Sequence, residues 1–318
     1  MGWLGIVETN GMFRGSVLWG TGNIQEVSRV TLDGNNLQGL GDDSDKPPDS
    51  LAVSSDVLVL VRESPDTIMR GGKLVAVTEI ETIRATREGS SLKLMSERTR
   101  DGMSMGRVEF SGRWIPRVPP APDLARVSFA DPIQLFNGRD LQGWKLVNSN
   151  RANGWRVVAG VLANCPDQQP DQPGRILSDL QTEREFEDFR LTCETRIPTN
   201  GNSGIYLRGV YEVQVADSFG RPPDVLGMGA LYGRIAPAVS AAKPAGAWQR
   251  LVITLVARHL TVVLNGVTII DNQPVLGCTG GALWGDGLRP GPIRLQGDHT
   301  AVELRNLKLE PVVWEAGS

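Results

Sequence analysis

Charged and amide side chains alternate with apolar ones in several strand-like segments of this 318-residue chain. In YEVQV, Glu212 and Gln214 alternate with Val213 and Val215, and in the preceding GIYLR segment Arg208 lies on the polar side of the same alternation. Side chains of a strand point to opposite sides with period two, so these polar groups are expected on one sheet face. A carboxyl group can transfer protons, and a guanidinium can bind hydroxyls or developing negative charge. The simplest interpretation is a solvated sheet face.

Two histidines occur in the whole chain, and their positions predict different roles. His299 lies in LQGDHTAVELRN beside Asp298, and histidine titrates near neutrality, as proton transfer requires. We therefore take His299 as a candidate acid/base or ligand, with a histidine that closes a loop through backbone hydrogen bonds as the alternative. His259, in VARHLTV, is predicted to be a surface histidine at a hairpin.

The elements that must position these residues are short strands separated by turn signals. The chain contains 37 Gly and 20 Pro, which favours many short strands over long helices. In DFRLTCETRI, Phe189, Leu191 and Cys193 alternate with polar residues and are expected to face a core. Asn265-Gly266 between two apolar runs predicts a tight hairpin. This pattern predicts an all-β protein with two packed sheets, a jelly roll or a related sandwich.

The length of the chain exceeds what one hydrophobic core usually organises, so we expect two domains. Residues 1–115 predict a small N-terminal antiparallel β domain. Residues 116–132 contain five prolines in seventeen residues and predict a semi-rigid linker. Residues 133–318 predict a second, larger β domain. Two segments, PDSLAVSSD and IAPAVSAAKPAG, suggest loops or a brief helical turn.

Composition excludes several classes of function. The net charge of −3, with both signs interspersed, provides no basic field for a nucleic acid. No stretch approaches the roughly 20 apolar residues of a membrane span. Three cysteines, Cys165, Cys193 and Cys278, are too few and too scattered for a disulfide framework or a four-ligand zinc site, although one disulfide stays open. No Walker loop, GxSxG motif or dinucleotide fingerprint is present.

Seven sequence blocks between about Phe136 and Val313 together carry a family resemblance. They are, in order, LFNGRDLQGW, EDFRLTCETRI, GNSGIYLRGVYEVQVAD, GALYGRIAP, KPAGAWQRLVI, VVLNGVTIID and GPIRLQGDHTAVELRNLKLEP. Together they resemble the 3-keto-disaccharide hydrolase domain family. The resemblance implies a concanavalin A-like β-sandwich, and the N-terminal part looks like an accessory region of some members. The family commonly shows Gly after the Asp-His pair, whereas this chain has Thr300, for which a positive φ is costly.

The resemblance implies cleavage of glycosides whose sugar carries a ketone at C3, by hydrolysis or by a lyase step followed by hydration. Such a ketone makes the C2 proton acidic, so the site needs a base near C2, donors for the enolate oxygen and an acid for the leaving oxygen. The resemblance makes Glu212, His299 and Arg208 the catalytic candidates. The substrate-binding candidates are Glu194, Gln214, Asp217, Tyr232, Lys243, Trp284, Asn202 and Gln296.

Structural interpretations stand beside several of these candidates. Arg208 can brace the sheet through an ion pair with a glutamate, and Asp217 can cap the loop that follows it. Trp284, in the Gly-rich segment GALWGDGLRPG, is the tryptophan expected to stack on a sugar. Three other tryptophans are expected to pack in the core, namely Trp144, Trp155 and Trp248.

We expect no cofactor and no metal, with calcium left open because lectin-like sandwiches often carry it. A separate oxidoreductase must then supply the 3-keto sugar to its glycoside-cleaving partner. The resemblance implies a periplasmic or secreted protein, and we expect the native signal peptide to be missing from this chain.

Three other functions remain open from the sequence. The first is a noncatalytic carbohydrate-binding module, because this fold hosts lectins as well as enzymes. The second is a structural repeat protein, although no internal repeat is found. The third is a conventional glycosidase with two carboxyl groups roughly 5 to 9 Å apart. Glu194 and Glu212 would be that pair if they lie on adjacent strands.

Overall fold

The computed structural model describes residues 2–9, 12–20, 22–32, 35–36, 57–164 and 177–314. Within these ranges the regular structure is β-strand apart from one short 3-10 helix, Leu124–Arg126, which confirms the predicted all-β class. None of these ranges holds a helix long and apolar enough to span a membrane. The segment PDSLAVSSD and Cys165 lie outside the described residues.

The chain divides into two compact units. One contains Gly2–Leu18 and Ile24–Pro116, and the other contains Trp19–Asn23 and the chain from Arg117 onward. The C-terminal part of the segment expected as a linker belongs to a sheet, because Ser128 and Phe129 pair with Val313 and Val312.

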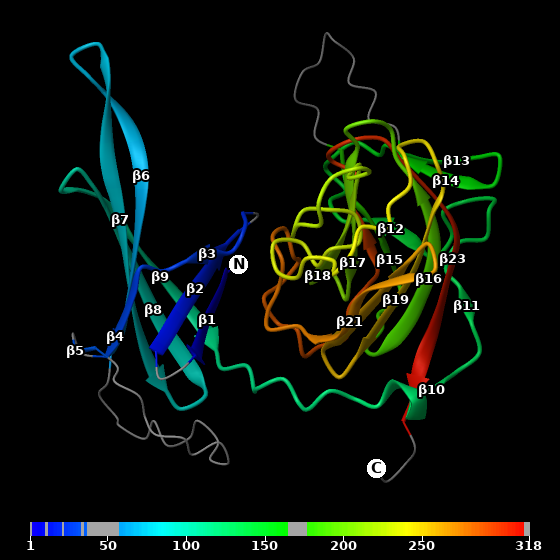
Figure 1. Ribbon diagram of the computed structural model, residues 1–318, viewed down its shortest axis with the longest axis horizontal. Coiled ribbons are helices and arrows are strands. Elements are labelled where there is room, and N and C mark those ends of the chain that lie inside the picture. The colour runs from blue at the N-terminus through cyan, green and yellow to red at the C-terminus, as the bar shows by residue number, and fades with distance from the viewer. Residues whose placement is uncertain are drawn as a thin grey trace. The chain divides into compact units, whose positions relative to one another are not determined.

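The N-terminal unit consists of two antiparallel sheets (Figure 1). The smaller has the order β1-β2-β3, and the larger has the order β5-β4-β6-β7-β8-β9. Their bounds are β1 Gly2–Thr9, β2 Met12–Trp19, β3 Gln25–Glu26, β4 Arg29–Leu32, β5 Asn35–Asn36, β6 Val57–Arg70, β7 Lys73–Glu88, β8 Ser91–Arg100 and β9 Met103–Arg113. The two sheets pack where Gly15 of β2 leaves room for the side chain of Leu60.

The C-terminal unit is a sandwich of a five-stranded and a nine-stranded antiparallel sheet (Figure 1). The five-stranded sheet has the order β12 (Trp144–Leu146), β15 (Leu180–Thr182), β22 (Arg294–Leu295), β17 (Asn202–Leu207) and β18 (Tyr211–Ala216). The path of the nine-stranded sheet is β13 (Trp155–Val158), β14 (Val161–Asn164), β23 (Val302–Val313), β16 (Phe189–Arg196), β19 (Gln249–Val256), β20 (His259–Leu264) and β21 (Val267–Pro274). The short strands β10 (Ser128–Phe129) and β11 (Ile133–Gln134) also pair with β23.

The core lies between the two sheets and follows the period-two alternation. Phe189, Leu191 and Cys193 of β16 are fully buried, which confirms their predicted inward orientation. From the five-stranded sheet, Ile205 and Val213 are also fully buried. Burying each large apolar side chain contributes on the order of 2 kcal/mol before the entropy of ordering it is subtracted. The alternate positions of β17 and β18 must therefore point to the outer face of their sheet.

Two turns show how local sequence determines the strand connections. Asn265 and Gly266 both have positive φ, at 53° and 88°, so the predicted tight hairpin between β20 and β21 is confirmed. The hairpin before β20 turns at Ala257 and Arg258. His259 follows it and is buried, with Nδ1 3.0 Å from the carbonyl oxygen of Ala257. The prediction of a surface histidine is wrong, because the ring packs against the hairpin that precedes β20.

Candidate active site

Two rows of residues cross the outer face of the five-stranded sheet. In the first, which we call the glutamate row, Tyr206 of β17 pairs with Glu212 of β18 on one side and with Arg294 of β22 on the other. In the second, the glutamine row, Gly204 pairs with Gln214, and the Gly204 carbonyl oxygen accepts a 2.9 Å hydrogen bond from the backbone amide of Gln296. Directly paired residues share a face, so both rows point to the same side of the sheet.

The carboxyl group of Glu212 lies at the centre of these rows. It is only 3% exposed, and the Tyr206 hydroxyl donates to its Oε2 over 2.8 Å. A Cβ on Gly204 would collide with its Oε1, so the glycine provides the space that the carboxyl occupies. Burial of Glu212 and Gln214 excludes the solvated face that was the simplest interpretation of the sequence pattern.

The environment of Glu212 favours a carboxyl group that titrates near neutrality. Burial raises the pKa of Glu212 from 4.5 to about 7, because the carboxylate loses its hydration. The Tyr206 hydroxyl and the positive charges of Arg294 and His299 act in the opposite direction, and the negative charge of Asp179 adds to the effect of burial. A group with this pKa can both donate and accept a proton at neutral pH.

Arg294 and Asp179 form a buried ion pair beside the glutamate row. The Arg294 Nε lies 2.6 Å from Asp179 Oδ2, and the two side chains are 9% and 8% exposed. The guanidinium also donates to the carbonyl oxygen of Gly281 over 2.6 Å and lies 4.1 Å from the centre of the Tyr206 ring. Asp179 Oδ1 accepts from the backbone amide of Gly297 over 2.8 Å. The pair holds the arginine charge where it acts on Glu212.

His299 approaches the rows from the loop before β23. Its Nδ1 lies 2.6 Å from Asp298 Oδ1, and this hydrogen bond raises the pKa of His299 above its ordinary value. The negative charges of Glu212 and Asp179 raise the His299 pKa further. His299 is exposed, in contrast to Glu212, so a ligand can reach its ring. The charges of the two residues that the sequence nominated for proton transfer therefore act on each other's pKa.

Thr300 fastens this loop to the start of β17. Its hydroxyl accepts from the backbone amide of Asn202 over 2.7 Å and donates to the backbone carbonyl oxygen of Asn202 over 2.9 Å. Thr300 is not among the described residues with positive φ, so the threonine costs no backbone strain here. Its side chain adds a tether that a glycine could not supply.

Four further candidates, Gln214, Asn202, Gln296 and Tyr232, lie around Glu212. The Gln214 Nε2 donates to Asn202 Oδ1 over 3.0 Å, while the Gln214 Oε1 is buried without a hydrogen-bond partner among the described residues. The same holds for the Gln296 Oε1. The Tyr232 amide donates to the Glu212 carbonyl oxygen over 2.9 Å, and burial together with the charge of Glu212 raises the pKa of Tyr232.

Arg208 is held away from the two rows by the hairpin between β17 and β18. It has a φ of 54°, and its guanidinium forms an ion pair with Asp188. The same guanidinium donates to the carbonyl oxygens of Glu187 over 2.6 Å and Gly287 over 3.1 Å. The expectation that Arg208 shares the Glu212 face did not allow for the turn, in which the alternation ends. The arginine on that face is Arg294.

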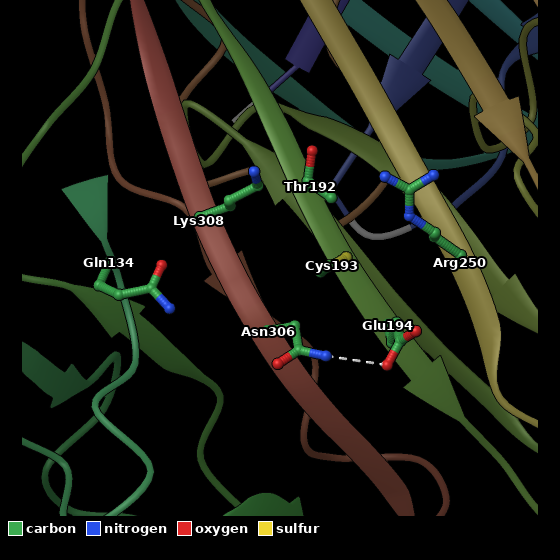
Figure 2. Close-up of a pocket in the computed structure, with 7 residues that line it drawn as sticks. All are labelled: Gln134, Thr192, Cys193, Glu194, Arg250, Asn306 and Lys308. Carbon is green, nitrogen blue, oxygen red and sulfur yellow. Dashed lines mark hydrogen bonds between the residues drawn. The ribbon is translucent and has the colours of Figure 1, made fainter. Parts of the chain in front are cut away.

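Glu194 lies on β16 in the nine-stranded sheet, so it is not on a strand adjacent to Glu212. The hypothesis of a Glu194–Glu212 catalytic pair on adjacent strands is therefore wrong. Glu194 Oε2 accepts from Arg305 over 2.6 Å and from Asn306 over 3.0 Å. Glu194 lines a cavity of about 310 Å³ on that sheet, and its side chain is labelled in Figure 2. The other residues that line the cavity are Gln134, Thr192, Cys193, Arg250, Asn306 and Lys308.

Lys243 and Asp217 also have structural partners. The exposed Lys243 precedes β19, and its Nζ lies 3.4 Å from the carbonyl oxygen of Trp248. The Asp217 carboxylate accepts from the Asn200 amide over 3.0 Å, as a loop-closing aspartate does. Neither contact reaches the two rows.

Two of the three tryptophans that were expected in the core are buried, and the third is not. Trp144 and Trp155 are buried, as predicted. Trp248 is only half-buried, with the guanidinium groups of Arg196 and Arg305 at 4.7 and 4.1 Å from its ring centre, so its core assignment is wrong. The ring of Trp284 has Arg289 at 3.9 Å from its centre, so one face of this expected sugar platform is covered.

Sequence reasoning missed Tyr206, Arg294 and Asp179. The signal for the first two was present, because Tyr206 and Arg294 are separated by two residues from Gly204 and Gln296 on the same strand faces. Asp179 precedes a three-residue strand, which is too short to show a period. Among the described residues, no group of three or more His, Cys, Asp or Glu side chains could hold a metal ion.

Comparisons with known proteins identify the family of the C-terminal unit. A family model for the 3-keto-α-glucoside-1,2-lyase-like domain matches residues 131–310, which include every residue of both rows. A search of the curated proteins found no match.

Solved structures similar to the chain include two candidate glycosyl hydrolases from Parabacteroides distasonis. The first has 28% identity over 62% of this chain and 93% of its own, with a TM-score of 0.46. The second has 21% identity over 57% and 94%, also with a TM-score of 0.46. An endo-β-1,3(4)-glucanase of family GH16 has 10% identity over 61% and 97%, with a TM-score of 0.37. Because the family model spans more than half of the sequence, the chain belongs to the 3-keto-α-glucoside-1,2-lyase-like, or 3-keto-disaccharide hydrolase, family of glycosidase-type, carbohydrate-acting enzymes.

Proposed function

We propose that the C-terminal unit cleaves glycosides whose sugar carries a ketone at C3, with Glu212 and His299 as the proton-transfer groups. The observation that carries this proposal is the buried Glu212 carboxyl, whose pKa is about 7, together with the charge coupling between it and His299. A carboxyl group of this kind is matched to acid/base chemistry at neutral pH.

The reaction follows from the acidity of the C2 proton beside the ketone. A base removes that proton, and the electrons of the C2–H bond form a C1–C2 double bond as the C1–O bond breaks. The departing oxygen takes a proton from an acid, which leaves an enone and a free alcohol. Addition of water across the new double bond then yields the free 3-keto sugar, so the net change is hydrolysis. No oxocarbenium ion is required.

The site has one group for each proton. The positive charge of His299 lowers the pKa of Glu212, and the negative charge of Glu212 raises the pKa of His299. Each residue therefore holds a proton more readily when the other does not. Asp298 orients the His299 ring through Nδ1, which leaves Nε2 available for the substrate. The positive charge of Arg294 stabilises an enolate at C3 electrostatically, which is the part that the sequence had suggested for Arg208.

The substrate must come from another enzyme. Oxidation of a sugar hydroxyl to a ketone removes a hydride and needs a redox cofactor, and the chain has no dinucleotide fingerprint. We therefore propose a separate oxidoreductase that supplies the 3-keto glycoside, with the reaction taking place in the periplasm or outside the cell. The catalytic steps proposed for this site do not call on a resident cofactor.

The proposal is tested by incubating the protein with a 3-keto-glucoside and with its unoxidised parent, while aglycone release is followed. We expect release from the ketone substrate alone. Glu212→Gln and His299→Ala are each expected to lower kcat by about 10²- to 10⁴-fold, the usual contribution of general acid/base groups.

The matched control is Glu310→Gln, which removes a carboxylate on β23 that pairs with Arg190 over 2.9 Å. This variant is expected to retain wild-type kcat. Equal cleavage of the unoxidised parent would replace the elimination mechanism with a conventional glycosidase. Absence of cleavage with saccharide binding retained would identify a noncatalytic carbohydrate-binding module.

A further inference from the structure

The glutamine row carries hydrogen-bond acceptors that the protein itself leaves unpaired. The Oε1 atoms of Gln214 and Gln296 are buried and have no partner in the described part of the chain. Both side chains are more than nine-tenths buried, at 4% and 9% exposure. Buried polar atoms in folded proteins are nearly always paired, and each exception costs free energy. Two such exceptions in the glutamine row indicate groups that are completed by a ligand.

The unpaired atoms are held in place by the structure around them. The Gln214 Nε2 is engaged by Asn202 Oδ1 at 3.0 Å, which leaves the oxygen as the free end of the amide. The backbone of Gln296 is fixed on both sides, since its amide donates to Gly204 and its carbonyl oxygen accepts from the Ser203 hydroxyl over 2.9 Å. Neither glutamine is free to shift its main chain in search of another partner.

The two amides flank the proposed catalytic carboxyl. Gly204 lies between Gln214 and Gln296 in the row and has no side chain, and the Glu212 carboxyl occupies the space above it. A sugar ring that presents its C1 and C2 atoms to Glu212 therefore has the two glutamine oxygens within the width of the same three strands. Neighbouring strands are about 4.8 Å apart, which is comparable to the size of a pyranose ring.

We propose that Gln214 and Gln296 form a subsite that accepts hydrogen bonds from two unoxidised hydroxyl groups of the sugar bound at Glu212. This inference rests on the proposed function for the identity of the sugar. Both free atoms are acceptors, so the ligand must supply donors at these points. A hydroxyl is such a donor, whereas a ketone, a carboxylate or an acylated oxygen is not.

The subsite also orients the substrate. A C3 ketone directed at either glutamine oxygen would place two acceptors against each other and leave both unpaired. The ketone is therefore directed toward the positive side of the site, where Arg294 and His299 act on Glu212. The substrate class is a neutral 3-keto sugar with free hydroxyls next to the reacting carbons, and sugars esterified at those positions are rejected.

The test replaces Gln296 by the apolar residue of most similar shape, in Gln296→Met. We expect KM for a 3-keto-glucoside to rise about tenfold, the size of one lost hydrogen bond, while kcat changes less than threefold. The melting temperature of the ligand-free protein is expected to stay the same or rise, because the variant no longer buries an unpaired acceptor. A glutamine that only supports the fold would give the opposite change in melting temperature.

Gln214→Met is the second variant, and a matched control is available in the other sheet. Gln214→Met is expected to raise KM similarly but to lower the melting temperature, because it also breaks the bond to Asn202. Gln249 is a buried glutamine of β19 whose Oε1 and Nε2 are both hydrogen-bonded within the protein. Gln249→Met is expected to lower the melting temperature and to leave KM unchanged.

Deoxy analogues of the 3-keto-glucoside identify the hydroxyls involved. For the wild-type protein, removal of a hydroxyl that donates a hydrogen bond to one of the glutamine oxygens is expected to lower kcat/KM about tenfold. In the variant of that glutamine, the same deoxygenation is expected to cost nothing further. Additive losses in variant and analogue, or unchanged KM in both glutamine variants, would overturn the subsite.

Failure of the subsite and failure of the proposed reaction are distinguishable. If wild type cleaves no glycoside but an unoxidised parent saccharide raises its melting temperature, and does not do so in Gln296→Met, the subsite stands and the reaction falls. If cleavage occurs and both variants keep wild-type KM, the reaction stands and the subsite falls. If no saccharide probe is cleaved or raises the melting temperature of wild type, both fall.

Discussion

The outer faces of the two sheets of the sandwich carry the same kinds of polar residue in opposite situations. On the nine-stranded sheet, Arg190 forms a pair of 2.9 Å hydrogen bonds to Glu310, and Arg305 binds Glu194 over 2.6 Å. Arg190 and Arg305 are 37% and 39% exposed, so water screens these pairs. On the five-stranded sheet, Glu212, Gln214, Gln296 and the Arg294–Asp179 pair are all buried.

The difference arises from loops that cover the five-stranded sheet. The Thr279 hydroxyl accepts from the backbone amide of Glu212 over 2.9 Å, and the Gly280 carbonyl oxygen lies 2.9 Å from the Tyr206 hydroxyl oxygen. The Gly281 carbonyl oxygen accepts from Arg294. One loop, residues 279–281, therefore contacts every residue of the glutamate row. Alternation along a strand therefore places polar groups on one face, and burial then shifts the pKa of a group such as Glu212.

The largest stability contrast is expected between the two arginines. Arg294→Met would leave Asp179 as an unpaired buried charge and should destabilise the protein by about 3–5 kcal/mol. Arg190→Met breaks an exposed pair and should cost less than about 1 kcal/mol. Urea denaturation followed by tryptophan fluorescence measures both. Equal losses would mean that the two faces do not differ in effective dielectric, and the comparison would fail.

A smaller effect of opposite sign is expected for Glu212→Gln. The pKa of Glu212 is about 7 in the folded protein and 4.5 ordinarily. Between these pH values the folded protein holds a proton that the unfolded chain has lost, so its stability falls as the pH rises from about 4.5 to about 7. The raised pKa corresponds to about 3 kcal/mol. Glu212→Gln cannot ionise, so it should exceed wild type in stability at about pH 8 and approach it at about pH 4.

Thermal unfolding of wild type and Glu212→Gln across this pH range measures the effect. Glu194→Gln provides the comparison on the other sheet, since it removes a carboxylate paired with Arg305. It is expected to give no stabilisation at any pH. A stability difference for Glu212→Gln that stays constant with pH would show that folding does not raise the pKa of Glu212.

The smallest effect concerns the loop that carries His299. Thr300→Val keeps the shape of the side chain but leaves the Asn202 amide without the hydroxyl that it contacts at 2.7 Å. We expect a loss of about 1 kcal/mol and a modest fall in kcat, because the loop is less firmly held. Thr268→Val, on the exposed part of β21, is the control and should have no effect on either measurement. A fall in stability without any change in kcat would separate the tether from the placement of His299.

Much of the fold could be predicted from the sequence because strand periodicity and turn chemistry are local. The inward orientation of Phe189, Leu191 and Cys193 and the Asn265-Gly266 hairpin needed only residues that are neighbours in the chain. His259 shows the limit of such reasoning. Its place at a hairpin was predicted, but its burial depends on the orientation of the ring, whose Nδ1 contacts the Ala257 carbonyl oxygen.

Some features of the candidate site follow from the local sequence, and others depend on contacts between residues far apart in the chain. The sequence by itself determined the sandwich, the family and the nomination of Glu212, His299, Gln214 and Gln296, because alternation and motif order are written along the chain. Only the tertiary structure decided that Glu194 lies in the other sheet and that Arg208 is held in a turn. It also decided that Arg294, Asp179 and Tyr206 surround the carboxyl, because strands far apart in sequence become neighbours only through sheet order.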